Sequence, residues 1–228
     1  MNNIEESNKP CTPLTEFKIT NDKFQLSNVD SKVIEGIENV VIMKNVLSVD
    51  ECKTIISTIY KIADKEKKGK DNEHFALFGS RYRRYSEELS KVLFERIKDQ
   101  LPSTITKPDP KDSTKSQIWK LDSLANKFKF IRYNKKQEFP KHTDNEFKLA
   151  EDRQSHLTIL FYLNNGGNDF KGGDLRLYHK TGINATLFTT FQPLTGSVVV
   201  FPHGVIHDSS PITKSKKYVV RSDVVYTL

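Results

Sequence analysis

The second half of the sequence is a run of short β-branched and aromatic segments, and this run most restricts what the chain can fold into. Beyond about residue 117, segments of about five to ten residues alternate with Gly, Asn and Pro, and no helical pattern lies between them. The segments are 128–133, 156–163, 174–178, 187–191, 196–201 and 217–226. This pattern predicts a strand sandwich or barrel.

Two amphipathic helices are predicted upstream of these strands. After a short apolar strand at 40–42, Ser48 and Glu51 have the spacing of a capping box, and an apolar stripe at helical spacing follows. A second helix begins near Ser86 and ends before Pro102. Two helices followed by many short strands predict an α+β domain, mainly β, with the helices packed on one face.

The predicted domain organisation follows from these changes in pattern. The first 35 residues are polar with little periodicity, so we expect a flexible or loosely packed N-terminal extension. The expected domain spans 36–228, with support helices at about 48–101, a proline-containing loop at 102–114 and a strand core at about 117–228.

Charge and cysteine content limit the expected partners and compartment. The net charge of +7 comes from lysines spread along the chain, and the densest run, 65–70, includes an acid and a glycine. This is typical of a solvated loop, so nucleic acid is not an expected partner. The sequence shows neither a membrane-length apolar run nor a secretory signal, and Cys11 and Cys52 are not spaced as a metal or redox pair. We therefore expect a cytoplasmic or nuclear protein without membrane contact, and we predict no particular oligomeric state.

A candidate metal site begins at the triplet His142-Thr143-Asp144. Residues i and i+2 of an extended segment point the same way, so this imidazole and this carboxylate can share one cation. The third ligand must come from elsewhere, and His203 and His207 are both candidates. Two histidines and one carboxylate on one face of an octahedron leave three positions open, as in non-haem Fe(II) oxygenases.

Six ordered blocks between about Leu121 and Tyr226 resemble the prolyl 4-hydroxylase-type branch of the 2-oxoglutarate dioxygenases. They read NKFKFIRYN, FPKHTDNEF, SHLTILFYLN, GGDLRLY, LTGSVVVFPHGVIHDSSPI and KKYVVRSDVVY, and they cover nearly half of the chain. The resemblance implies a double-stranded β-helix, also called a jelly roll or cupin-like fold, with N-terminal support helices. It also implies that the metal ligands are His142, Asp144 and His207, because the family's distal histidine stands four residues before a proline. His203 is then a supporting or surface residue.

The same resemblance implies a site for the co-substrate 2-oxoglutarate. The family holds the distal carboxylate of 2-oxoglutarate with a Lys or Arg about ten residues past the distal histidine. Lys217 is the preferred candidate, and Arg221, four residues further on the same strand face, is the alternative. Four further positions match residues that line the co-substrate in the family: Tyr133, Thr158, Tyr162 and Leu175.

The implied activity is hydroxylation of a C–H bond with release of succinate and CO2. It requires Fe(II), 2-oxoglutarate and O2, with ascorbate as a candidate reductant, and no catalytic side chain beyond the metal ligands. The resemblance suggests a prolyl residue of a protein or peptide as the substrate. The alternatives are a small-molecule hydroxylase of the same superfamily and a non-catalytic cupin-like module that binds a metal or ligand.

Overall fold

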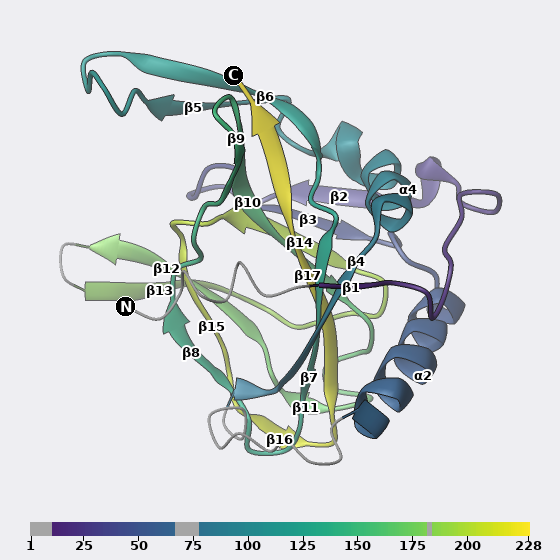
Figure 1. Cartoon of the computed structure of the whole chain (residues 1–228). Helices are drawn as coiled ribbons and strands as arrows, with labels where there is room; N and C mark the ends of the chain where they lie inside the picture. The colour runs from purple at the N-terminus through teal and green to yellow at the C-terminus, as the bar shows by residue number, and fades with distance from the viewer. Residues whose placement is uncertain (1–10, 67–77, 182–183) are drawn as a thin grey trace.

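Two β-sheets packed face to face form the body of the molecule (Figure 1). The computed structural model describes residues 11–66, 78–181 and 184–228. Within these ranges the larger sheet has eleven strands: β1 (Thr12–Pro13), β2 (Asp30–Val33), β3 (Val41–Lys44), β4 (Ser80–Tyr85), β5 (Thr104–Pro108), β6 (Ser116–Leu124), β7 (Lys127–Tyr133), β9 (Lys148–Ala150), β10 (Arg153–Tyr162), β14 (Val198–Pro202) and β17 (Lys217–Thr227). The main path across this sheet is β1-β4-β7-β17-β10-β14-β3-β2, and all pairs along it are antiparallel except β1 with β4.

The smaller sheet closes over one face of the larger one. Its strands run in the order β13-β12-β15-β8. The strands β11 and β16 pair with each other in a separate two-stranded sheet; in the sequence β11 precedes β12 and β16 follows β15. Their bounds are β8 (Phe139–His142), β11 (Lys171–Gly172), β12 (Leu175–Thr181), β13 (Asn184–Phe191), β15 (Ile206–Ser209) and β16 (Ile212–Lys214). The predicted mainly β, jelly-roll fold is confirmed.

The two predicted helices are α2 (Val49–Glu66) and α4 (Glu87–Ile97), and the predicted capping box of Ser48 and Glu51 is formed. The Ser48 hydroxyl accepts from the Glu51 amide at 3.1 Å, and the Glu51 carboxylate accepts from the Ser48 amide at 2.7 Å. The Ser86 hydroxyl accepts from the Leu89 amide at 3.1 Å. The described residues also contain two single 3₁₀ turns, η1 (Leu26–Asn28) and η2 (Lys98–Gln100).

Alternation along the central strands divides the core into two layers. On β10, Ile159 and Phe161 face the helices, whereas Tyr162 packs in the cluster between the two sheets. On β17, Val220 faces the helices and Val219 faces the smaller sheet. Because strand side chains alternate with a period of two, every second residue of these strands points toward the space between the sheets.

Residues 11–33 of the expected N-terminal extension make defined contacts with the domain. β1 pairs with β4, and β2 pairs with β3. Glu16 lies 2.6 Å from the Arg84 guanidinium in a buried ion pair, and the Phe17 ring meets Phe130 edge-on with centroids 6.1 Å apart. This attachment is firmer than the sequence predicts, while the division of the chain at residue 35 stays a prediction.

Several strands fall where the sequence predicts none, among them β4, β5 and β6. The prediction of a loop over 102–114 is wrong in part, because β5 pairs with β6 in a hairpin that projects from the body (Figure 1). Pro108 is tolerated because it is the last residue of an edge strand. β4, with sequence SRYRRY, is rich in charge and lacks the apolar signal of a buried strand. No helix in the described residues is long and apolar enough to cross a membrane.

The buried guanidinium of Arg96 gives a test of how the helices are held. Arg96 is 1% exposed; it donates to both Glu51 oxygens at 2.8 and 3.0 Å and to the carbonyls of Val46 and Thr20. Removing one partner of a buried pair leaves the other charge uncompensated, so Arg96→Ala should lower the free energy of unfolding by about 3 kcal/mol in urea titrations. Lys98→Ala, which removes an exposed pair with Glu95, should change it by less than about 0.5 kcal/mol. Equal effects of the two substitutions would contradict this account.

Candidate metal centre and co-substrate pocket

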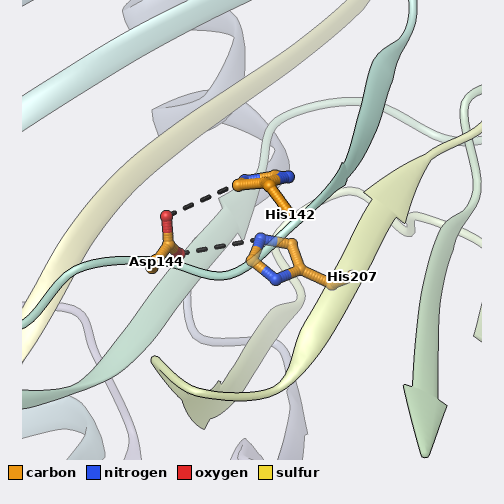
Figure 2. A group of neighbouring side chains, drawn as sticks. All are labelled: His142, Asp144 and His207. Carbon is orange, nitrogen blue, oxygen red and sulfur yellow. Dashed lines mark ion pairs between the residues drawn. The ribbon is translucent and has the colours of Figure 1, made fainter. Parts of the chain in front are cut away.

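Two histidines and one aspartate converge at the end of the smaller sheet (Figure 2). His142 ends β8 and is paired in register with His207 on the neighbouring β15, and Asp144 follows two residues after His142. The carboxylate oxygens of Asp144 lie 3.8 Å from His142 Nε2 and 3.6 Å from His207 Nε2. Two atoms about 2.1 Å from one ion and at right angles are about 3 Å apart, so these three groups need little movement to share a metal.

Backbone carbonyls orient both imidazoles toward the centre. Nδ1 of His142 lies 2.8 Å from the Pro140 carbonyl, and Nδ1 of His207 lies 2.9 Å from the Val205 carbonyl. A carbonyl only accepts, so each Nδ1 carries the proton and each Nε2 has a lone pair available to a metal ion beside Asp144. Burial, and then the neighbouring His207, lowers the pKa of His142 to about 4, and burial also lowers the pKa of His207. Both rings are therefore neutral near pH 7, as metal ligation requires.

Asp144 is held as a carboxylate by groups behind and beside it. Burial opposes its ionisation, but Arg221, His207 and the Thr158 hydroxyl outweigh burial and keep the pKa of Asp144 below its ordinary value. The Arg221 guanidinium lies 3.2 Å from Oδ1, and the Thr158 hydroxyl donates to Oδ2 at 2.5 Å. His203, the histidine that the resemblance excludes as a ligand, donates from Nδ1 to Thr158 at 2.8 Å and is 1% exposed.

A cavity of about 620 Å³ opens beside the three converging side chains and contains a buried lysine. Lys217 Nζ donates to the Gly173 carbonyl at 2.6 Å and to the Ser209 hydroxyl at 2.9 Å. The rings of Tyr133 and Tyr162 lie 5.3 and 5.4 Å from this ammonium. Burial lowers the pKa of Lys217 to about 7, and among the described residues the Tyr162 hydroxyl has no hydrogen-bond partner. A buried cation beside an unpartnered hydroxyl suits an anionic ligand.

The remaining residues that the sequence singled out divide into two groups. Leu175 lines the cavity with Tyr133, Tyr162 and Lys217, as expected of co-substrate contacts. Arg221 also lines it, but its charge is taken up by Asp144 and by Asp223, whose oxygen lies 2.9 Å away. Thr158 is not at the cavity wall in the described part of the chain and instead contacts Asp144 from behind.

The sequence does not reveal two features of this site. The Asp208 carboxylate, next to His207, accepts hydrogen bonds from Arg176 at 2.7 and 2.9 Å and from the Tyr178 hydroxyl at 2.7 Å, so both of its oxygens are already engaged. A cationic wall formed by β4 and β7 also faces the cavity and includes Arg83 and Lys129. Alternating charge in these strands is visible in the sequence, but only the fold shows that their charged face looks into a cavity.

Comparison with known proteins identifies the domain. Residues 128–222 match the family model of the 2OG-Fe(II) oxygenase superfamily, and they include the three candidate metal ligands and Lys217. No curated protein matches the sequence. The segment 128–222 is therefore a 2OG-Fe(II) oxygenase domain, and Fe(II), 2-oxoglutarate and O2 are the metal and co-substrates of this class.

Solved structures place the fold more narrowly, with the prolyl hydroxylases. A prolyl-4-hydroxylase from Pseudomonas putida superposes with a TM-score of 0.51 at 17% identity, covering 82% of this chain and 91% of that chain. The viral collagen prolyl hydroxylase of Paramecium bursaria Chlorella virus-1, in its 2-oxoglutarate complex, gives 0.51 at 15% identity, covering 86% and 99%. The fold is that of a prolyl 4-hydroxylase-type 2-oxoglutarate oxygenase. The two neutral imidazoles and one carboxylate fit Fe(II) by their donor chemistry.

Loss of either histidine should abolish metal binding. His142→Ala and His207→Ala each remove one of three ligands, so the anaerobically loaded variants should retain far less than one equivalent of Fe(II) in metal analysis. His203→Ala is the matched control, because its imidazole contacts Thr158 and Ser155 rather than the centre. Stoichiometric iron in either of the first two variants would refute the assignment.

The depressed pKa of Lys217 predicts the pH dependence of co-substrate binding. The ammonium form binds a carboxylate, and with a pKa of about 7 in the free protein that form is lost as the pH rises. The affinity for 2-oxoglutarate should fall about tenfold per pH unit above pH ~8, with uptake of about one proton on binding. Calorimetry of the metal-loaded protein in buffers of different ionisation enthalpy measures both quantities.

Variants at the two candidate cations complete this test. Lys217→Met should weaken binding of 2-oxoglutarate by about tenfold to a hundredfold and remove its pH dependence. Arg221→Met should weaken it less, because Arg221 is paired with Asp144 and Asp223. The opposite ranking would transfer the role to Arg221, and no effect of either variant would exclude this pocket as the 2-oxoglutarate site.

Proposed function

We propose that the chain is a prolyl 4-hydroxylase-like dioxygenase that uses His142, Asp144 and His207 to bind Fe(II). The observation that carries the proposal is the convergence of two unprotonated Nε2 atoms and one carboxylate at a cavity that also holds a buried lysine. A metal-binding module without turnover has no need of such a lysine, so the non-catalytic cupin-like alternative is disfavoured.

The balanced reaction sets what the side chains must do. Fe(II) with 2-oxoglutarate supplies O2 activation, so that one oxygen atom enters succinate, CO2 leaves and the other oxygen becomes the product hydroxyl. Lys217 pairs with the distal carboxylate of 2-oxoglutarate, and the Tyr162 hydroxyl is available as a second donor. No side chain has to act as nucleophile or general base.

Orientation is the main contribution of the remaining residues. Arg221 and Thr158 each contact one oxygen of Asp144, which limits rotation of that carboxylate and fixes the oxygen presented to the metal. Val219, Leu175 and Phe139 contribute apolar surface to the same cavity. A dry, fixed site strengthens each electrostatic contact with the co-substrate.

A prolyl residue of a protein or peptide is the substrate we propose. Its support is the likeness in fold to two prolyl hydroxylases over most of the chain. Ascorbate is the proposed reductant that restores Fe(II) after turnover without substrate. We also propose a reducing compartment, the cytoplasm or nucleus, because Cys11 and Cys52 are both free thiols in this structure.

Substrate-stimulated succinate formation tests the proposed function. The protein with Fe(II), 2-oxoglutarate and ascorbate should form succinate slowly alone, and faster with proline-containing peptides that gain 16 Da, about the mass of one oxygen atom, in mass spectrometry. Peptides with alanine in place of proline serve as the matched control. Stimulation by small molecules alone would favour the small-molecule hydroxylase, and the absence of any 2-oxoglutarate turnover would overturn the proposal.

A further inference from the structure

A row of cations crosses three neighbouring strands on the face that looks into the cavity. Arg83 on β4 stands directly opposite Lys129 on β7, and Lys129 stands directly opposite Arg221 on β17. All three residues line the cavity, as do Arg81 and Lys127 from the same two strands. Like charges placed directly opposite one another in a sheet are destabilising, so this arrangement costs stability unless something compensates for it.

The acidic residues of the cavity wall are paired with groups other than Lys129. Glu146 pairs with Lys107 and His156, each at 3.0 Å. Asp223 lies 2.9 Å from Arg221, which also takes up the charge of Asp144. Asp144 and Asp223 therefore compensate Arg221, and within the described residues none of these acids forms an ion pair with Lys129.

Lys129 is the residue of the row whose ammonium is left without an ion pair among the described residues. Within the described part of the chain its ammonium makes neither a hydrogen bond nor an ion pair, although the residue is only partly exposed. Burial, followed by the nearby Arg221, lowers the pKa of Lys129 to about 8; Asp223 and Asp144 oppose this shift, and Arg83 adds to it. A partly desolvated ammonium held between two guanidinium groups attracts any anion that can enter the cavity.

We propose that this row, centred on Lys129, binds the carboxylate of an acidic residue in the peptide substrate, close to the residue that is hydroxylated. The inference rests on the proposed function and deepens it by naming the substrate class as an acidic peptide. The row is chemically distinct from Lys217, which lies deeper, among Tyr133, Tyr162 and Gly173.

The spacing of the strands indicates where in the peptide the acid must lie. Arg221 is 3.2 Å from Asp144, and Lys129 stands one strand further from the candidate metal centre. Neighbouring strands lie about 5 Å apart and an extended peptide advances about 3.3 Å per residue, so the acidic residue should be within about three positions of the target.

The mixture of charges on this wall favours separate carboxylates over a nucleic-acid backbone. Asp223 and Glu146 line the same cavity as Lys129, so an evenly spaced chain of phosphates would meet acids as well as bases. Apolar side chains such as Phe139, Phe147 and Ile131 contribute to the lining and suit the aliphatic parts of a peptide.

Peptide binding to the Fe(II)- and 2-oxoglutarate-loaded protein under anaerobic conditions tests the inference. Labelled peptides of equal length carry one central proline and either glutamate, glutamine or lysine at the flanking positions, and fluorescence anisotropy gives their affinities. The glutamate peptide should bind about tenfold more tightly than the glutamine peptide, as expected for a charge-assisted contact. Raising the salt concentration should reduce this preference.

Three variants locate the preference in the row. Lys129→Gln should bring the ratio of the two affinities close to one, and Lys129→Glu should make the lysine peptide the tighter ligand. Lys91→Gln, which replaces an exposed lysine on α4 outside the cavity, should leave the ratio unchanged. Circular dichroism shows whether each variant is folded.

The outcomes separate this inference from the proposed function. Equal affinity of the wild-type protein for glutamate and glutamine peptides, or a preference that survives Lys129→Gln, overturns the inference even if 2-oxoglutarate turnover is intact. Stronger competition by a single-stranded oligonucleotide than by an acidic peptide of equal charge also overturns it. A protein without 2-oxoglutarate turnover refutes the proposed function, and the charge preference can still be measured on the same samples.

Discussion

The antiparallel ladder between β10 and β17 is the interaction on which the cavity depends. Leu160 stands opposite Arg221 and Tyr162 opposite Val219, and the same strand β17 places Lys217 opposite Tyr133 on β7. A slip of one residue in this ladder would turn the inward side chains of one strand toward the helices. The co-substrate lysine, the arginine beside Asp144 and the aromatic rings around them therefore share a single register.

The helix-facing side of the same strands holds that register in place. Val220, Val224 and Phe161 are at most 3% exposed and pack against α2 and α4. Each such side chain contributes about 1.5–3 kcal/mol when buried, so exchanging it for a charged neighbour from the other face would be very unfavourable. The apolar face thus fixes the register of the strands and with it the position of the polar face. The polar face alone would stabilise different registers about equally.

This division explains what the sequence predicts and what it does not. Strands with an apolar face, such as β10, β14 and β17, and the capped helices are found where the pattern indicates them, and the three candidate ligands meet as the resemblance implies. β4 and β5 are missed because their residues are charged or include proline, and their pairing partners supply the stability that their own sequences lack. The role of Arg221 is missed for a related reason, since its contacts with Asp144 and Asp223 depend on a loop and a strand meeting in space.

The two lysines of the cavity show how binding and stability oppose one another in this fold. Burial lowers the pKa of both Lys217 and Lys129, which means that the empty cavity disfavours the charged forms that anion binding requires. An anionic ligand removes part of this cost when it binds, so ligand binding and folding stability are coupled through the same two charges. A ligand carboxylate that pairs with only one of the two lysines leaves the charge of the other uncompensated. The unpaired lysine then has the larger effect on which substrates enter the cavity.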